Sequence, residues 1–286
     1  MKRLSIAFLT LCISGIAFSQ TGTGVQAENG TIKLTNGQKF TVESTIDIEA
    51  SLSMGGEMTS NSSTVNALEV KNSAATDYTI SNTLTRLKLN TIMMGQSNNY
   101  DSENKEGNNA EFAGMLDDRL NKPVDIVIDN RTGLPVSEKK KAKKADADES
   151  SAAGDLMKMF SDNSDDAIVA SAFQVIPAGK KTGDSWADTT AEKDMKIIRR
   201  YTLKSQTNDE AVVLLDAVAS AVNKLNFMEM EFEIKTNTKT TGEIISDIKT
   251  GLVKKRTAVA DISGTFQMMG QDMPISAKTN TVSVYK

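Results

Sequence analysis

The amino-acid sequence predicts a mainly β (α+β) protein with one or more long, curved antiparallel sheets and two or three central helices covering one face. Three observations predict this class. Long segments alternate between apolar and polar residues, glycine and aspartate recur in the turns between them, and helix signals are confined to the middle of the chain. Since alternation places the apolar side chains on one face of a strand, that face is expected to need a cover.

The clearest strand is predicted from Phe40 to Leu52. Its apolar residues share one face and its polar residues the other: Phe40, Val42, Ile46, Ile48, Ala50 and Leu52 against Thr41, Glu43, Thr45, Asp47, Glu49 and Ser51. The pattern returns from Met228 to Ile234, opposed by Glu229, Glu231, Glu233 and Lys235. Threonine, valine and isoleucine, which favour strands, dominate the less regular candidates. These are residues 78–94, 123–129, 196–203, 211–218, 242–247, 252–269 and 275–285.

Two turn sequences occur twice. Residues 93–96 (Met-Met-Gly-Gln) recur at 268–271, with a looser version at 54–58, and Asp129–Leu134 matches Asp247–Leu252 as Asp-x-x-Thr-Gly-Leu. Glycine tolerates the positive φ of a tight turn, and aspartate can bond the backbone two residues on. We interpret both as repeated hairpin turns that reflect an internal duplication.

Methionines gather at the Met-Met-Gly-Gln turns and the looser version. Flexible thioethers suit adaptable apolar surfaces, so a hydrophobic-ligand groove near these turns is one interpretation, and ordinary core filling is the other. The methionines concerned are Met54, Met58, Met93, Met94, Met268, Met269 and Met273.

Three helices are predicted, over 111–120, 151–160 and 164–173, the last beginning with Ser164, Asp165 and Asp166 as a cap and acidic first turn. The lysine-rich stretch 138–150 is interpreted as a solvated linker or a helix extension, with a docking site for an acidic partner as the alternative. The chain is therefore divided into a strand-rich half at 20–137, a linker with helices at 138–173, and a strand-rich half at 174–286. The two halves are compatible with one continuous domain.

Residues 1–19 have the three parts of a secretory signal peptide: Lys2 and Arg3, an apolar run to Phe18, and small residues at the expected cut after Ser19. The alternatives are a retained anchor, for which the run is short, and a lipoprotein acylated on Cys12, which lies mid-run after Leu11. We expect an exported protein, periplasmic or extracellular, without a transmembrane anchor after cleavage.

The amino-acid composition limits the kinds of functional site that the chain can form. Cys12 is the single cysteine and leaves with the signal, so the mature chain is expected to form no disulfide. The absence of histidine excludes the usual general base, zinc ligand and triad member. Without Lys2 and Arg3 the net charge falls from −4 to −6, which does not favour nucleic-acid binding.

Acidic groups offer no specific site in the sequence. Asp117-Asp118 and Glu229/Glu231/Glu233 have spacings that a solvated surface explains equally well. The run 162–166 alternates oxygen side chains as calcium loops do, but Ala167 stands where an EF-hand requires glycine, so a helix cap explains it better. We assign no catalytic, cofactor-binding or metal-binding residues and expect no cofactor.

Short motifs carry a resemblance to a known family. Gly183-Asp184-Ser185-Trp186, Gly37-Gln38-Lys39-Phe40 and the two Asp-x-x-Thr-Gly-Leu turns resemble a family of secreted Gram-negative proteins catalogued only as a domain of unknown function, over about residues 26–286. The resemblance implies export and a β-rich body without assigned activity. At the level of architecture alone, the expected fold is similar to periplasmic lipid and lipoprotein carriers.

These features together predict a non-enzymatic protein of the cell envelope that binds a ligand or partner on a curved sheet. In its sharper form the prediction is an apolar-ligand carrier, and an envelope protein is the other partner expected. The alternative is a carboxylate-dependent hydrolase acting on envelope polymers, which needs two acidic side chains converging in a cleft.

Overall fold

The computed structural model describes residues 30–52, 56–93, 95–136, 165–192, 194–227, 230–268 and 271–286. The signal peptide, the lysine-rich linker and the helix expected at 151–160 lie outside the described residues, so they stay predictions.

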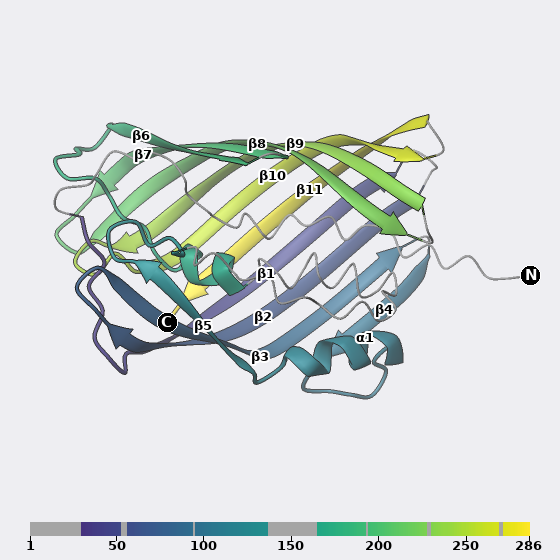
Figure 1. Cartoon of the computed structure of the whole chain (residues 1–286), viewed down its shortest axis with the longest axis horizontal. Coiled ribbons are helices and arrows are strands. Elements are labelled where there is room, and N and C mark those ends of the chain that lie inside the picture. Colours follow the sequence, from purple (N-terminus) through teal and green to yellow (C-terminus); the bar gives the residue numbers. More distant parts are fainter. Residues whose placement is uncertain are drawn as a thin grey trace, which may run out of the picture.

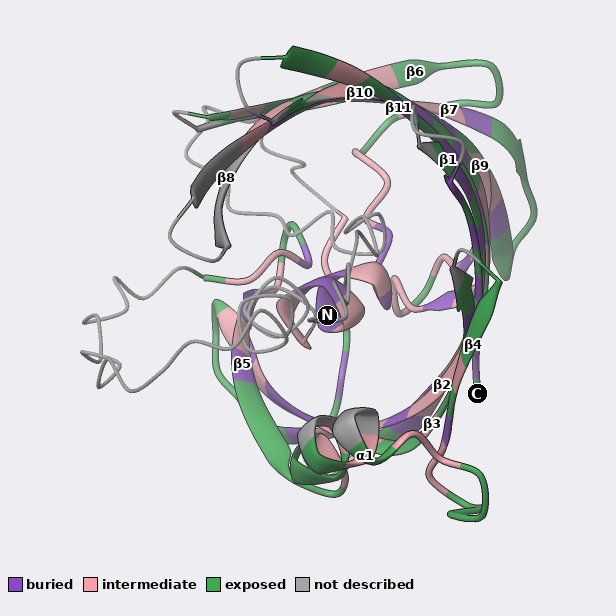
Figure 2. Ribbon diagram, turned by 90° about the vertical axis from the view of Figure 1, so that its right-hand side faces the viewer, coloured by how far each residue is buried: buried purple, intermediate pink, exposed green. Residues whose placement is uncertain are grey.

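The described residues form one antiparallel sheet of eleven strands, which curves strongly around its own concave face (Figures 1 and 2). Its order is β4-β3-β2-β1-β11-β10-β9-β8-β7-β6, and β5 pairs with the other half of β3. The strands are β1 (Lys39–Leu52), β2 (Gly56–Ser73), β3 (Asp77–Met93), β4 (Gln96–Asp101), β5 (Pro123–Asp129), β6 (Ser185–Glu192), β7 (Met195–Gln206), β8 (Glu210–Phe227), β9 (Met230–Asp247), β10 (Val253–Met268) and β11 (Gln271–Tyr285).

The alternation predicted for the first strand is confirmed. Phe40, Val42, Ile48 and Ala50 are buried, and the acidic residues Asp47 and Glu49 between and beside them are exposed. Since β1 pairs with β11, strands from both halves of the chain belong to one continuous sheet.

The expectation of two or three central helices covering one face is not supported. The helix α1 (Ala110–Leu116), followed by the 3-10 turn η1 (Asp117–Arg119), lies beside β4 at one edge of the sheet (Figure 1). Residues 165–171 are helical, and this short segment lies within the curve of the sheet (Figure 2). Its buried side chains Ala167, Val169 and Ala170 cover only part of the concave face.

The main hydrophobic core lies at one end of the concave face, which we call the core end. Strand residues such as Phe40, Leu68 and Ile244 pack there against Ile32 and Phe173 from the two covering segments, 30–36 and 165–176. The rings of Phe40 and Phe173 meet edge to face at 6.4 Å. The covering segments are thus held by apolar contacts at a single end of the sheet.

Hydrogen bonds fix the first covering segment in place. The Tyr78 hydroxyl donates to the Ile32 carbonyl at 3.1 Å and accepts the Leu34 amide at 3.2 Å. The Ile32 amide donates to Asn130 O at 2.8 Å, and the next amide along donates to Thr250 O at 3.0 Å. One extended segment therefore joins both Asp-x-x-Thr-Gly-Leu turns.

The sheet contains an internal repeat of four strands. The first unit is β1, β2, β3 and a fourth strand split into β4 and β5; the second is β6, β7, β8 and β9, and an Asp-x-x-Thr-Gly-Leu turn ends each unit. Near the first strand of each unit, a glycine amide donates to the second strand at 2.8 Å: Gly37 to Val70 O, and Gly183 to Leu203 O.

Further irregularities coincide between the units. The strand register shifts between Val70 and Asn72 in the first unit, and between Leu203 and Ser205 in the second. The residue after each turn aspartate also donates to the third residue of a neighbouring hairpin turn, as Asn130 to Thr76 O and Ile248 to Asp209 O. Shared irregularities of this kind support the duplication inferred from the turn sequences, although the Met-Met-Gly-Gln turns are not at equivalent positions.

We predict that Gly133→Ala destabilises the fold more than Gly107→Ala. Both glycines have positive φ, +73° and +82°, so both substitutions strain the backbone by about 1 kcal/mol. A Cβ at Gly133 would also lie 2.7 Å from Phe173 Cβ, whereas one at Gly107 meets nothing within 4 Å. Overpacking should add about 1–3 kcal/mol to the loss at Gly133, measured by urea unfolding. Equal losses would show that the turn does not pack tightly on Phe173.

Candidate functional site

The concave face changes character along the strands. Next to the core end, register places a zone of small side chains on this face. Beyond it lies an apolar group that we call the distal cluster. The small residues are Ser44, Ser62, Thr64, Thr238, Thr240, Ala258, Ala260, Thr279, Thr281 and Ser283.

The distal cluster consists of Ile46, Ile48, Ala50, Met58, Ile262 and Ala277. All its members come from β1, β2, β10 and β11, four neighbouring strands, whereas the core end also receives side chains from the covering segments. Among the described residues, the distal cluster is therefore built by the sheet alone, and all its members except the partly buried Ile46 are buried.

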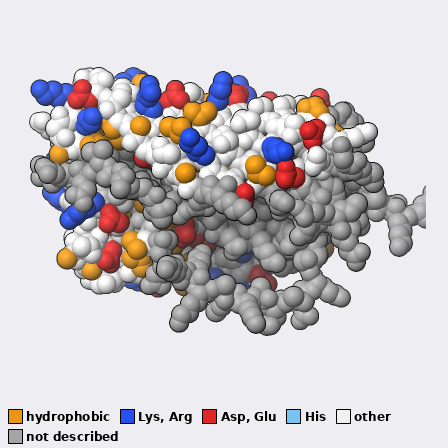
Figure 3. All heavy atoms as spheres, turned by 45° about the horizontal axis from the view of Figure 1, so that its top comes forward, with side chains coloured by type: hydrophobic (Ala, Val, Ile, Leu, Met, Phe, Trp, Pro, Cys, Tyr) orange, Lys and Arg blue, Asp and Glu red, His pale blue; other side chains and the backbone are white. Residues whose placement is uncertain are grey.

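The convex face differs from the concave one. The part seen in Figure 3 carries basic and acidic side chains interspersed with separate hydrophobic ones. Exposed apolar residues such as Val218 and Val259 alternate along their strands with concave ones. Such scattered apolar residues are ordinary on a solvated surface.

A charged cluster faces the concave side from β6 and β7. Arg199, only 2% exposed, forms an ion pair with Asp188 at 2.6 Å and donates from the same nitrogen to Thr190 Oγ1 at 3.2 Å. Trp186 stacks on Tyr201, with ring centroids 5.6 Å apart and 20° between the planes. Alternation within each strand brings these side chains to one face.

The pKa of the Tyr201 hydroxyl depends on charged side chains from three strands. Burial raises the pKa of Tyr201, and the charge of Asp188 raises it further, while the positive charges of Arg199 and Arg256 oppose the shift. The phenol therefore stays protonated at neutral pH and acts as a hydrogen-bonding group. Arg256, on β10, belongs electrostatically to the same region as the β6–β7 cluster.

The internal repeat gives Arg199 a counterpart. Arg199 lies four residues before Leu203, and Asn66 lies four residues before the equivalent Val70. Asn66 is 1% exposed, and neither its amide nitrogen nor its oxygen has a hydrogen-bond partner in the part of the chain that is described. Both units thus present a buried polar group to the concave side at the same place.

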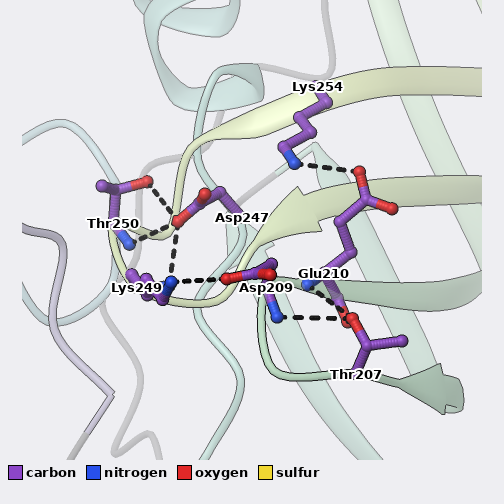
Figure 4. Close-up of polar contacts among 7 residues, drawn as sticks. All are labelled: Thr207, Asp209, Glu210, Asp247, Lys249, Thr250 and Lys254. Atoms are coloured by element: carbon purple, nitrogen blue, oxygen red, sulfur yellow. Dashed lines mark hydrogen bonds and ion pairs between the residues drawn. The ribbon is translucent and has the colours of Figure 1, made fainter.

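The second Asp-x-x-Thr-Gly-Leu turn is a compact polar network (Figure 4). Asp247 Oδ1 accepts the amides of Lys249 and Thr250 at 2.9 Å each, and the Thr250 hydroxyl at 3.0 Å. Lys249 also pairs with Asp209. A pocket of about 290 Å³ adjoins this turn, lined by residues including Gln174, Lys180 and Asp247, and its volume is at the lower limit for a small-molecule site.

The acidic groups considered from the sequence lie in separate places. Asp117 accepts the Tyr100 hydroxyl at 2.6 Å, and Asp118 pairs with Lys122 at 3.4 Å. Glu233 pairs with Lys235 at 2.8 Å, whereas Glu229 lies outside the described residues.

The run expected to cap a helix is described only from its fourth residue. Asp165 begins the helical segment and binds Asn82 Nδ2 at 2.7 Å and Arg119 at 3.3 Å. Of the methionines that suggested a groove, Met58 is a buried member of the distal cluster, and Met54, Met94 and Met269 lie outside the described residues.

The described residues contain no group of three or more acidic, cysteine or histidine side chains arranged to hold a metal ion. None of their helices has the length and apolar character needed to cross a membrane.

Sequence reasoning did not single out Asp188, Arg199, Tyr201 or Arg256. The available signal was alternation: Trp186 and Asp188 are two residues apart, as are Arg199 and Tyr201, so each pair shares a face of its strand. A charged residue on the face that also carries a tryptophan or a tyrosine breaks the usual pattern.

A family model covers most of the repeat. The model of DUF6263, described as a family of unknown function, matches residues 75–253, more than half of the chain. The chain belongs to the DUF6263 family. The resemblance to a family of unknown function is thereby confirmed, and the matched region contains Gly183–Trp186 and both Asp-x-x-Thr-Gly-Leu turns.

Three solved structures show remote similarity to this DUF6263 protein. Lipovitellin, solved for its lipid–protein interactions, is 9% identical with a TM-score of 0.47, over 89% of this chain and 25% of that chain. The COG4313 outer membrane channel of Pseudomonas putida F1 is 8% identical with a TM-score of 0.21, over 92% of this chain and 100% of that one. OccK5 (OpdH) of Pseudomonas aeruginosa is 4% identical with a TM-score of 0.21, over 88% and 98%.

This DUF6263 protein thus spans a quarter of the lipovitellin chain to which it is similar. The low TM-scores assign it neither a ligand nor an activity. No curated protein sequence matches it.

We predict that Asp247→Asn lowers stability at pH 7 by about 1 kcal/mol, because the amide accepts these hydrogen bonds less strongly than a carboxylate. Burial raises the pKa of Asp247, but hydrogen bonds from Thr250 and Lys249 and the charge of Lys254 outweigh it, so the net pKa lies below its usual value. A lowered carboxyl pKa contributes stability above the unfolded-state value that is lost as pH falls through the folded-state value. The difference from wild type should therefore shrink below about pH 4 in urea unfolding.

The same substitution at Asp261, an exposed residue on the convex face of β10, controls for the loss of one negative charge. A difference at Asp247 that stayed constant from pH 7 to pH 3 would contradict the assigned role of its carboxylate.

Proposed function

We propose that this DUF6263 protein is an exported, non-enzymatic binding protein of the cell envelope that holds an apolar ligand on the concave face of its sheet. The observation that carries the proposal is the distal cluster, in which apolar side chains of four neighbouring strands meet on the concave face. The covering segments pack at the core end instead. An apolar ligand is the occupant that suits such a surface.

The energetics of burial agree with this proposal. Each methylene group transferred from water to an apolar surface contributes about 0.8 kcal/mol, so about ten methylenes supply up to roughly 8 kcal/mol. That is the free energy of micromolar binding before the entropy of the ordered chain is subtracted. A long alkyl chain therefore gains more free energy from this face than a small apolar molecule does.

The sequence supports the remaining parts of the proposal. The signal-peptide pattern of residues 1–19 favours export to the periplasm or beyond, and cleavage would remove the single cysteine. The lack of histidine favours binding over catalysis.

The carboxylate-dependent hydrolase has no comparable support. Among the described residues, Asp117, Asp118 and Glu233 each contact a different lysine, and Asp188 is bound to Arg199. Ion pairs of this kind satisfy the carboxylates without any reaction partner. The binding protein is therefore the function that we carry forward.

We predict that native mass spectrometry and lipid extraction of protein purified from its own host will reveal a bound alkyl-chain compound. Ile46→Glu should reduce its occupancy at least tenfold, because a carboxylate would then face the alkyl chain on the concave side. Ile46 is only partly buried, so the fold should tolerate the change.

Thr45→Glu is the matched control, since Thr45 is the exposed neighbour of Ile46 on the convex face of β1. It adds the same charge one residue away and should leave occupancy unchanged. Absence of any alkyl compound from wild-type protein, or equal losses in the two variants at unchanged melting temperature, would refute the proposed function.

A further inference from the structure

Arg256 reaches the concave face from the middle of the sheet. It pairs across β10 with Ile244 of β9 and Ser283 of β11, so it shares their face. The positive charges of Arg256 and Arg199 both oppose the rise in the pKa of Tyr201, which lies on the same concave face.

Among the described residues whose charges act on Tyr201, there are two arginines and one acidic residue, Asp188. Asp188 forms its 2.6 Å ion pair with Arg199. Arg256 makes no hydrogen bond or ion pair with any residue that the structure describes, and its Nε is buried without a partner. Buried guanidinium nitrogens are ordinarily hydrogen-bonded, because removing them from water without a partner is unfavourable. The region therefore has the charge to accept a monoanion.

Several neighbours of Arg256 on the concave face are small, and Arg256 as a whole is only partly buried. Along β10 the next residue on that face is Ala258, which pairs with Gly242, and Ser283 stands opposite Arg256 itself. These are among the smallest side chains available. A planar carboxylate could therefore approach the guanidinium, whose fork matches it in geometry.

The strand β10 also connects this charge to the distal cluster. Arg256, Ala258, Ala260 and Ile262 follow one another on the same face, so the positive charge and the apolar end are separated by six residues. At about 3.3 Å per residue, that separation is roughly 20 Å. An extended long-chain fatty acid has its charged and apolar ends in the same arrangement.

We propose that the ligand of the concave face is a long-chain monoanionic amphiphile, a fatty acid in its simplest form, whose carboxylate binds Arg256 beside Arg199 and Tyr201 and whose alkyl chain follows β10 to the distal cluster. This inference rests on the proposed function and adds the head group to it. Arg256 is a specificity-determining residue in this arrangement, because an uncharged chain of equal length gains nothing from it.

The test compares hexadecanoate with hexadecanol, which has the same chain length and no charge, at concentrations below aggregation. Trp186 is the single tryptophan and stacks on Tyr201 beside the expected carboxylate, so its fluorescence reports binding. Titration calorimetry provides a second measurement that does not depend on the tryptophan. Wild-type protein should bind hexadecanoate at least tenfold more tightly than hexadecanol.

Arg256→Gln should abolish this preference and leave hexadecanol binding unchanged. Lys255→Gln is the matched control, because it removes one positive charge from the same strand. Lys255 is the exposed neighbour of Arg256 on the convex face. It should preserve the preference. Melting temperatures establish that the variants fold, and Arg256→Met, which keeps the volume of the side chain, replaces Arg256→Gln if the latter does not.

The outcomes separate the two proposals. Equal affinities for hexadecanoate and hexadecanol in wild-type protein, or a preference that survives Arg256→Gln, would overturn the head-group assignment and leave the apolar-ligand function intact. Binding of neither compound would overturn both. Acetate tests the head group alone: if it bound as tightly as hexadecanoate, the site would be a small-anion site and the alkyl chain would have no role.

Discussion

The pairing of the first strand with the last is the constraint on which the rest of this structure depends. Eleven residue pairs, from Val42–Tyr285 to Leu52–Ile275, join β1 to β11 and make the two four-strand units parts of one sheet. We call this β1–β11 pairing the seam. Without it the small-residue zone and the distal cluster would be divided, because their members come from β1 and β2 on one side and β10 and β11 on the other. The concave face is continuous across the sheet only because β1 pairs with β11.

The concave face has two parts, the core end and the remainder of the face. The core end satisfies the need for a packed interior, with Ile32 and Phe173 brought in by segments that the sheet itself cannot provide. The remainder of the face combines small, apolar and a few charged side chains, and its apolar members form the separate distal cluster. Arg199 and its repeat counterpart Asn66 mark the boundary between these two zones in both units.

The sequence predicted the elements whose faces differ most. Alternation located β1, where Phe40 and Val42 oppose acidic residues, but it missed β2, whose concave positions include Ser60, Ser62 and Asn66 and therefore show no apolar period. Periodicity cannot report which strands will be neighbours either. For that reason Asp188 and Arg199, eleven residues apart, were not recognised as partners. For the same reason α1, expected to cover the sheet, was not recognised as a neighbour of the edge strand β4.

The seam also determines when the sheet can finish folding. Glu43 and Lys286, an ion pair at 2.8 Å beside the seam, are separated by 243 positions in the chain. Contacts between residues so distant in sequence form slowly, since the loop-closure entropy is lost before they contribute. Until the last strand has been synthesised, β1 has an unpaired edge and an apolar face, which are the features that favour aggregation. Only the pairing of β11 with β1 closes this edge.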